Sequence, residues 1–179
     1  LAPPPLDRIL GSQEVRALPA SARDWGVEVH YPRYRYLPRL STRWNPALIA
    51  RAVLPLARRL HAETPFDVVD AQFFYPDGPA AARVARALGL PLSIKARGSD
   101  IILWGQRPYA LRQLLMAADA AAGLLSVSAA LRRDMIALGM DGDKIALHYT
   151  GLDHALFRPL PRAEARAALE RVGMGDFAR

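Results

Sequence analysis

The most constraining feature of this sequence is a regular alternation of short β-rich runs with helical runs, which begins at Asp67. Strands are predicted at residues 67–71, 92–96, 124–127 and 144–149, and the helices between them at residues 79–88, 109–118 and 129–138. Such repetition produces a parallel sheet with right-handed crossover connections. The sequence therefore predicts an α/β fold, namely a doubly wound parallel sheet with helices on both faces.

The chain before this region is less regular. Residues 1–24 show little periodicity, and residues 27–31 form the first predicted strand. Asn45 followed by proline predicts an N-cap and the start of a helix that extends to Glu63, with a bend at Pro55. The arginines expected on the outer side of this helix are Arg51, Arg58 and Arg59.

Composition excludes several classes of site. The chain has no cysteine, so a disulfide framework, a thiolate metal site and a cysteine nucleophile are excluded, and a cytoplasmic setting is permitted. Its four histidines lack metal-ligand spacing, and no metal site is predicted. Neither a G-x-G-x-x-G fingerprint nor a Walker loop occurs, which disfavours ordinary dinucleotide enzymes and P-loop NTPases.

Basic residues outnumber acidic ones by 24 to 17, which gives a net charge of +7. This excess favours anionic partners such as nucleotide sugars or phospholipid head groups. An arginine-rich, alanine-rich sequence can equally reflect genome composition, and nucleic acid is not expected as a partner. No apolar run reaches the length of about 18 residues that a membrane span requires.

A candidate site follows from the predicted sheet, because ligands of doubly wound folds bind beyond the carboxyl ends of the strands. The segments that follow the predicted strands are residues 74–78, residues 97–100, Ser128 and residues 150–153. Within them, Gly98 and Gly151 are expected to allow close approach of the backbone to a ligand. Arg97 is suited to pair with phosphate or carboxylate, and Asp100 to accept sugar hydroxyls.

Each of these residues also has a purely structural interpretation. Gly78 before a proline starts a helix, Ser128 is suited to cap one, and Asp153 is suited to stabilise a turn. Arg97 and Asp100 together are equally consistent with a surface ion pair.

The ordered segments resemble the N-terminal domain of family 4 of the retaining glycosyltransferases. Residues 66–78 (FDVVDAQFFYPDG) are similar to its D-V-[IV]-[HD]-A strand and the loop that follows, and residues 90–100 (LPLSIKARGSD) to its G-x-P strand and [RH]-G-x-D loop. Residues 126–128, then 139–145 and 151–159, resemble the remaining motifs of the series. The likeness covers residues 66–159 well and 25–65 loosely.

The resemblance implies a Rossmann-like domain that is one half of a GT-B fold. Residues 1–159 would form this N-terminal domain, and residues 160–179 the linker and the start of a missing C-terminal donor-binding domain. Together the two domains would transfer a sugar, with retention, from a UDP- or GDP-linked donor to a glycan or lipid-linked acceptor. The chain is therefore expected to be a fragment that is inactive alone and binds no cofactor itself.

The resemblance also implies roles for particular residues, although it assigns no catalytic residue. The residues expected to line the acceptor cleft are Tyr75, Asp77, Gly78, Arg97, Gly98, Ser99 and Asp100. Those expected at the interdomain edge are Ser128, Gly151 and Asp153. The family's glycine-rich first loop has no clear match, Arg97 stands where many members carry histidine, and Thr150 replaces the usual asparagine.

The expected location is the cytoplasm, with peripheral contact to the inner face of the membrane. Two other functions stay open at this point. One is a non-catalytic basic module that binds anionic lipid or nucleic acid through the arginines of the helix at residues 45–63. The other is a different GT-B enzyme such as a sugar-nucleotide epimerase.

Overall fold

A computed structural model of the chain describes residues 18–35 and 42–174. The chain divides into two compact units, Leu1–Tyr149 and Thr150–Arg179, and each is described by itself. The predicted domain boundary after residue 159 stays a prediction.

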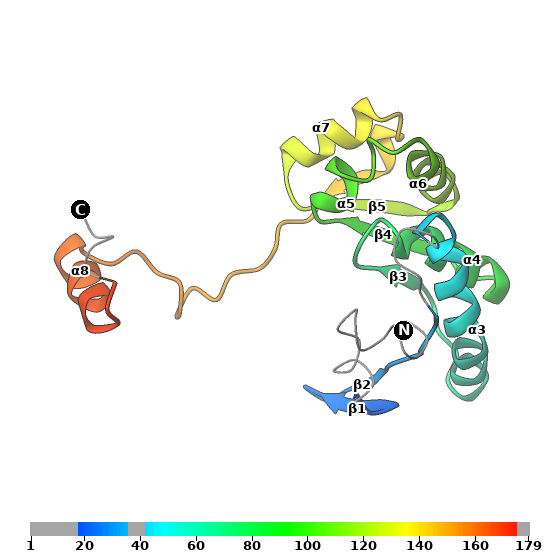
Figure 1. Cartoon of the computed structure of the whole chain (residues 1–179), viewed down its shortest axis with the longest axis horizontal. Coiled ribbons are helices and arrows are strands. Elements are labelled where there is room, and N and C mark those ends of the chain that lie inside the picture. The colour runs from blue at the N-terminus through cyan, green and yellow to red at the C-terminus, as the bar shows by residue number, and fades with distance from the viewer. Residues whose placement is uncertain (1–17, 36–41, 175–179) are drawn as a thin grey trace. The chain divides into compact units, whose positions relative to one another are not determined.

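The first unit is built on a four-stranded parallel sheet with the strand order β3-β4-β5-β6 (Figure 1). The strands are β3 (Val69–Ala71), β4 (Leu92–Ala96), β5 (Gly123–Ser126) and β6 (Ile145–Leu147). Ile94 of β4 pairs with Ala71 on one side and with Leu124 on the other. The predicted α/β fold with a Rossmann-like parallel sheet is confirmed.

Helices connect successive strands of this sheet. They are α4 (Asp77–Leu88), α5 (Ser99–Ile102), α6 (Pro108–Ala120) and α7 (Ala129–Ala137), and a 3-10 turn, η2 (Gly142–Lys144), precedes β6. As predicted, α4 ends at Gly89, whose φ of 70° is left-handed, and Ser128 caps α7 by accepting a hydrogen bond from the Leu131 amide. The short helix α5 was not predicted, because one turn is too short to show a periodic pattern.

The core lies between the sheet and these helices. Leu92, Ile94 and Ala96 alternate along β4, so their side chains share one face of the sheet, and all three are buried. They belong to the same apolar cluster as residues of α4, α6 and α7, such as Ala85 and Leu114. The cluster includes Ala71 and Ala96, the last residues of β3 and β4, and so holds in place the strand ends from which the loops of the candidate site begin.

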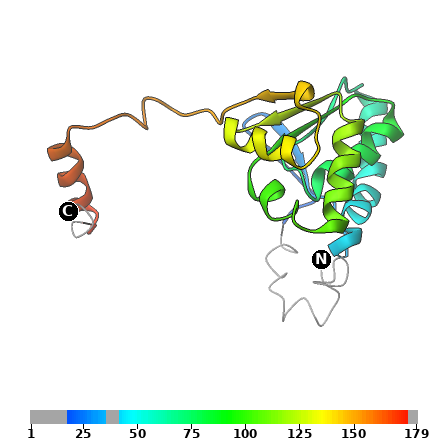
Figure 2. The ribbon, with the colours of Figure 1, turned by 90° about the horizontal axis from the view of Figure 1, so that it is seen from above.

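The helix α3 (Asn45–Glu63), preceded by the 3-10 turn η1 (Thr42–Trp44), packs against α4 through a second buried cluster around Ala50 and Val84 (Figures 1 and 2). The predicted N-cap at Asn45 is wrong by one residue. Trp44 is the N-cap, because η1 already holds its backbone at φ −99° and ψ −4° and leads directly into the helix. The outer arginines of α3 are exposed, as predicted: Arg51, Arg58 and Arg59.

A separate two-stranded antiparallel sheet joins β1 (Ser21–Asp24) to β2 (Val27–His30). Trp25 and Gly26 form the turn, with φ of 49° and 82°, which is the pattern of a tight type I′ hairpin. The strand β2 was predicted from the sequence, but no element was predicted in residues 1–24, of which residues 1–17 lie outside the described residues.

The second unit contains helix α8 (Arg162–Arg171). None of its residues is buried. Among the residues that the structure describes, no helix is long and apolar enough to cross a membrane.

Candidate functional site

The loops after β3 and β4 meet at a buried carboxylate, that of Asp100. Its Oδ2 atom accepts a hydrogen bond from the Phe74 amide at 2.7 Å, and its Oδ1 atom accepts one from the Gly98 amide at 2.7 Å. The Arg97 amide donates to both oxygens, at 3.0 and 3.1 Å. Since the Asp100 side chain has no exposed surface, it holds the backbone of two loops rather than forming a surface ion pair.

Above this carboxylate, the tip of the second loop faces solvent. Arg97 and Ser99 are exposed, and Gly98 is half-buried. The backbone of Gly98 has φ of 129° and ψ of −78°, a conformation that residues other than glycine rarely adopt. No atom lies within 4 Å of the position that a Cβ would take. The loop therefore presents an exposed guanidinium, an exposed hydroxyl and an uncovered stretch of backbone.

Asp77, at the start of α4, is an exposed acidic residue. Partial desolvation and, second, the negative charge of Asp100 raise the pKa of Asp77 above its ordinary value. Its carboxyl group therefore takes up a proton more readily than that of a free aspartate. Asp77 adds a hydrogen-bonding group at the same edge of the sheet as Arg97.

Gly78 is a packing residue in this structure. A Cβ at this position would lie 3.2 Å from a side-chain atom of Ile94 and 3.3 Å from one of Phe74. Both of these neighbours are fully buried. Glycine thus allows the first turn of α4 to approach the core of the sheet, which agrees with the structural interpretation of Gly78.

Tyr75 is buried below the loops. Its hydroxyl donates a hydrogen bond of 3.0 Å to the Thr42 carbonyl oxygen, and its ring lies 4.7 Å from that of Trp104 and 6.5 Å from that of Tyr109. Burial and, second, the nearby Tyr109 raise the pKa of Tyr75 to about 12. Tyr75 is therefore neutral and supports the loops from within the core.

The aromatic cluster around Tyr75 was not predicted from the sequence. Trp104 is half-buried, and the Arg107 guanidinium lies 5.3 Å from the centre of its ring. Next to Trp104, Ile102 and Leu103 are 55% and 62% exposed, so the same loop carries apolar surface. The available signal was the run of large apolar residues between two predicted elements, where a polar loop is the norm.

The remaining predicted site residues form local turns. Ser128 caps α7, and its carbonyl oxygen accepts a hydrogen bond from the Ser126 hydroxyl at 2.9 Å. Asp153 and Gly151 belong to the second unit, where Asp153 accepts a hydrogen bond from the Ala155 amide at 2.9 Å. Within the first unit, the structure brings together the residues of the loops after β3 and β4. Gly151 and Asp153 belong to the other unit and are not part of this group.

The chemistry of the site is that of a polar binding surface. Arg97, Ser99 and Asp77 are its exposed groups, and Tyr75, Gly78 and Asp100 support them. Among the described residues, no group of three histidine or acidic side chains is placed to hold a metal ion.

The amino-acid sequence was compared with family models and with curated proteins. A model of Glycosyltransferase Family 4 matches residues 11–156. No curated protein sequence matches the chain.

The fold is similar to that of solved structures of the Anabaena protein HepE. The crystal structure of HepE in complex with UDP matches with a TM-score of 0.55 and 18% sequence identity, over 72% of this chain and 33% of HepE. The structures of HepE with UDP-glucose, and with UDP and glucose, match with the same TM-score and coverage and 17% identity. The chain therefore spans about a third of the length of HepE.

Proposed function

The chain belongs to Glycosyltransferase Family 4, and from this premise we propose that it is the N-terminal, acceptor-binding domain of a GT-B glycosyltransferase. The complete enzyme transfers a sugar from a nucleotide sugar to a glycan or lipid-linked acceptor with retention of configuration. It acts in the cytoplasm. The 179-residue chain alone transfers no sugar, because the donor is bound by a second Rossmann-like domain.

The observation that carries this proposal is the joining of the two loops by Asp100 at the carboxyl edge of the sheet. Parallel α/β sheets bind ligands at this edge. Here the exposed guanidinium of Arg97 donates to acceptor oxygens, and the Ser99 hydroxyl adds a further hydrogen bond. Because Asp100 fixes the backbone beneath them, these groups are held in place before the acceptor arrives, which lowers the cost of positioning it.

The donor in this proposal is a nucleotide sugar linked to UDP or GDP. The complexes of HepE with UDP and with UDP-glucose favour the UDP-linked form. Membership of the glycosyltransferase family disfavours the alternative of a sugar-nucleotide epimerase.

Calorimetric titration tests which of the two domains binds the nucleotide sugar. UDP- and GDP-sugars are titrated into the 179-residue chain and into a longer protein that includes the second domain, with the free sugars as controls. The proposal predicts binding to the longer protein only. Tight binding to the short chain would place the donor site in this domain and overturn the proposal, as would absence of binding to both proteins.

A further inference from the structure

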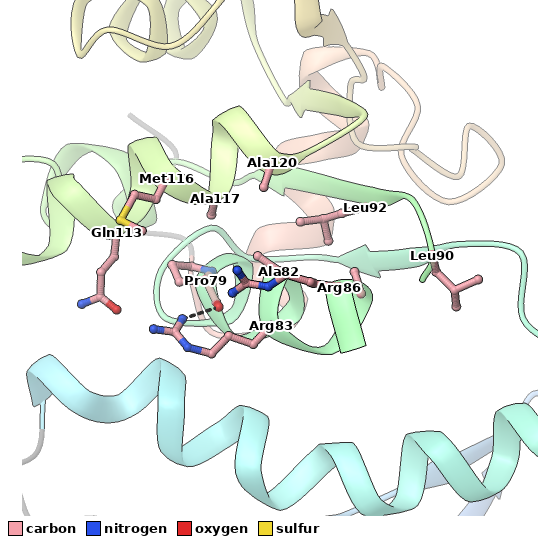
Figure 3. A pocket seen from close by; sticks show the side chains of 11 residues that line it. Pro79, Ala82, Arg83, Arg86, Leu90, Leu92, Gln113, Met116, Ala117 and Ala120 are labelled. Carbon is pink, nitrogen blue, oxygen red and sulfur yellow. Dashed lines mark hydrogen bonds between the residues drawn. The ribbon is translucent and has the colours of Figure 1, made fainter. Parts of the chain in front are cut away.

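A groove lies on the helical layer, formed by η1, α4 and α6. It consists of two hollows of about 340 and 440 Å³, and both are lined by Arg83, Gln113 and Met116. Figure 3 shows Arg83 and Arg86 extending from α4, and Gln113 and Met116 extending from α6, around the first hollow. The Gln113 amide donates a 3.2 Å hydrogen bond to the Arg43 carbonyl oxygen, which connects η1 to α6.

The described residues that line this groove carry only positive charge. They include Arg43, Arg83, Arg86 and Arg112, and no aspartate or glutamate is among them. In the part of the chain that the structure describes, none of these guanidiniums forms an ion pair. Because like charges gathered without counter-charges repel one another, this arrangement favours an anionic occupant.

Apolar side chains lie beside these cations. Met116 is 67% exposed and Trp44 is 54% exposed, and the Arg43 guanidinium lies 5.0 Å from the centre of the Trp44 ring. The floor of the first hollow contains buried apolar residues, among them Leu92 and Ala117. The occupant must therefore offer both negative charge and apolar surface.

We propose that this groove, which we term the arginine groove, docks the anionic head groups of a lipid membrane. Phosphate groups of the lipids would pair with the guanidiniums, while Trp44 and Met116 would enter the region between head groups and acyl chains. All four arginines are exposed at the rim. A site for a small soluble anion would instead enclose its cations, so this exposure favours an extended surface.

The proposal differs from the lipid-binding alternative that the sequence left open, in which the contact is made by Arg51, Arg58 and Arg59 on α3. None of these residues lines the arginine groove. The proposal is also independent of the candidate acceptor site, because Arg97 and Ser99 do not line the arginine groove. Failure of either proposal is thus distinguishable from failure of the other.

The test is co-sedimentation of the 179-residue chain with vesicles of phosphatidylcholine alone, and with vesicles that contain about 30 mol % phosphatidylglycerol. Binding is expected only to the anionic vesicles, and it should weaken as salt rises from about 0.1 M to 1 M. The variant Arg83→Gln with Arg112→Gln should bind about 30-fold more weakly, as expected for the loss of two arginines near a charged surface.

The matched control is Arg51→Gln with Arg58→Gln, which removes the same charge from exposed positions outside the groove and should keep most of the affinity. Vesicle binding should also shift tryptophan emission to shorter wavelength, and Trp44→Phe should remove most of that shift. Equal loss in both double variants, loss in the control alone, competition by inorganic pyrophosphate as strong as by vesicles, or no binding to anionic vesicles would each overturn the proposal.

Discussion

The carboxylate of Asp100 accepts a 2.7 Å hydrogen bond from the backbone amide of Phe74, which lies 26 residues earlier in the chain. Phe74 follows β3, and Asp100 lies in the short helix α5, which begins just after the neighbouring strand β4. This hydrogen bond, together with those from the Arg97 and Gly98 amides, joins the two loops to each other. The exposed groups of the candidate site therefore depend on a residue that has no exposed surface itself.

Substitution of Asp100 should mainly reduce stability. Asp100→Ala leaves three buried or half-buried backbone amides without their acceptor, and we expect it to lower the free energy of unfolding by about 3–5 kcal/mol. Asp100→Asn keeps one acceptor oxygen and should cost about 1–2 kcal/mol. Urea denaturation measures both changes.

Asp141→Ala is the matched control for Asp100. The Asp141 side chain accepts an exposed hydrogen bond from the Asp143 amide, and the substitution leaves the Asp141 carbonyl oxygen, which accepts from the Lys144 amide, in place. Loss of the side-chain hydrogen bond should cost about 1 kcal/mol or less. An equal loss of stability in Asp100→Ala and Asp141→Ala would show that Asp100 does not hold the two loops together.

Gly98→Ala tests the conformation of the loop that carries Arg97. Alanine at φ of 129° is strained, and we expect the free energy of unfolding to fall by about 1–3 kcal/mol, although no atom blocks the new methyl group. Gly123→Ala is the control, because it also meets no atom within 4 Å but its φ lies outside the left-handed range. A loss of stability no larger than in the control would mean that the loop adopts another conformation.

The sequence predicted the parts of the fold that have strong periodicity. The strand at residues 92–96 and the helix that ends at Gly89 agree with the structure, because a buried strand and a left-handed helix end each have a local pattern. The hairpin strand Ser21–Asp24 was missed, since its four residues are mostly exposed and polar. The family was recognised because several weak motifs occur in order.

The candidate site was predicted as a region rather than as a set of roles. The rule for parallel sheets located the loops that contain Arg97 and Asp100. Local sequence does not show that the Asp100 side chain turns inward to amides of two loops, because one of those amides belongs to a distant residue. The partners of Tyr75 also come from three separate segments, at Thr42, Trp104 and Tyr109.

Tyr75 should make stability depend on alkaline pH. Its pKa is about 12 in the folded chain against 10.0 ordinarily, so folding favours the protonated form. The resulting stability is fully present below pH 10 and is lost as pH rises toward 12. Tyr75→Phe should reduce this loss by on the order of 2 kcal/mol. At neutral pH the same variant should cost about 1 kcal/mol through the hydrogen bond to Thr42.

Chemical denaturation at pH 7, 10 and 12 measures this dependence for the original chain and for Tyr75→Phe. Tyr149→Phe is the control, because Tyr149 is 64% exposed. It should leave the pH dependence unchanged. A loss between pH 10 and 12 that is the same in all three proteins would show that Tyr75 does not cause it.

Arg97→Ala should separate function from stability. The Arg97 side chain is exposed, and its backbone amide, which the substitution leaves in place, makes the contact with Asp100. The free energy of unfolding should therefore change by no more than about 0.5 kcal/mol. In the complete enzyme, loss of charged hydrogen bonds to the acceptor should lower kcat/KM for the acceptor by about 10- to 100-fold and leave the KM for the nucleotide sugar unchanged.

Steady-state kinetics with each substrate varied in turn distinguishes these outcomes. Arg97→Lys keeps the positive charge and should recover part of the activity, whereas Arg133→Ala removes an exposed arginine of α7 and should have no effect. If Arg97→Ala instead raised the KM for the nucleotide sugar alone, the guanidinium would bind the donor phosphates. The exposed edge above Asp100 would then belong to the donor site, and the acceptor would bind elsewhere.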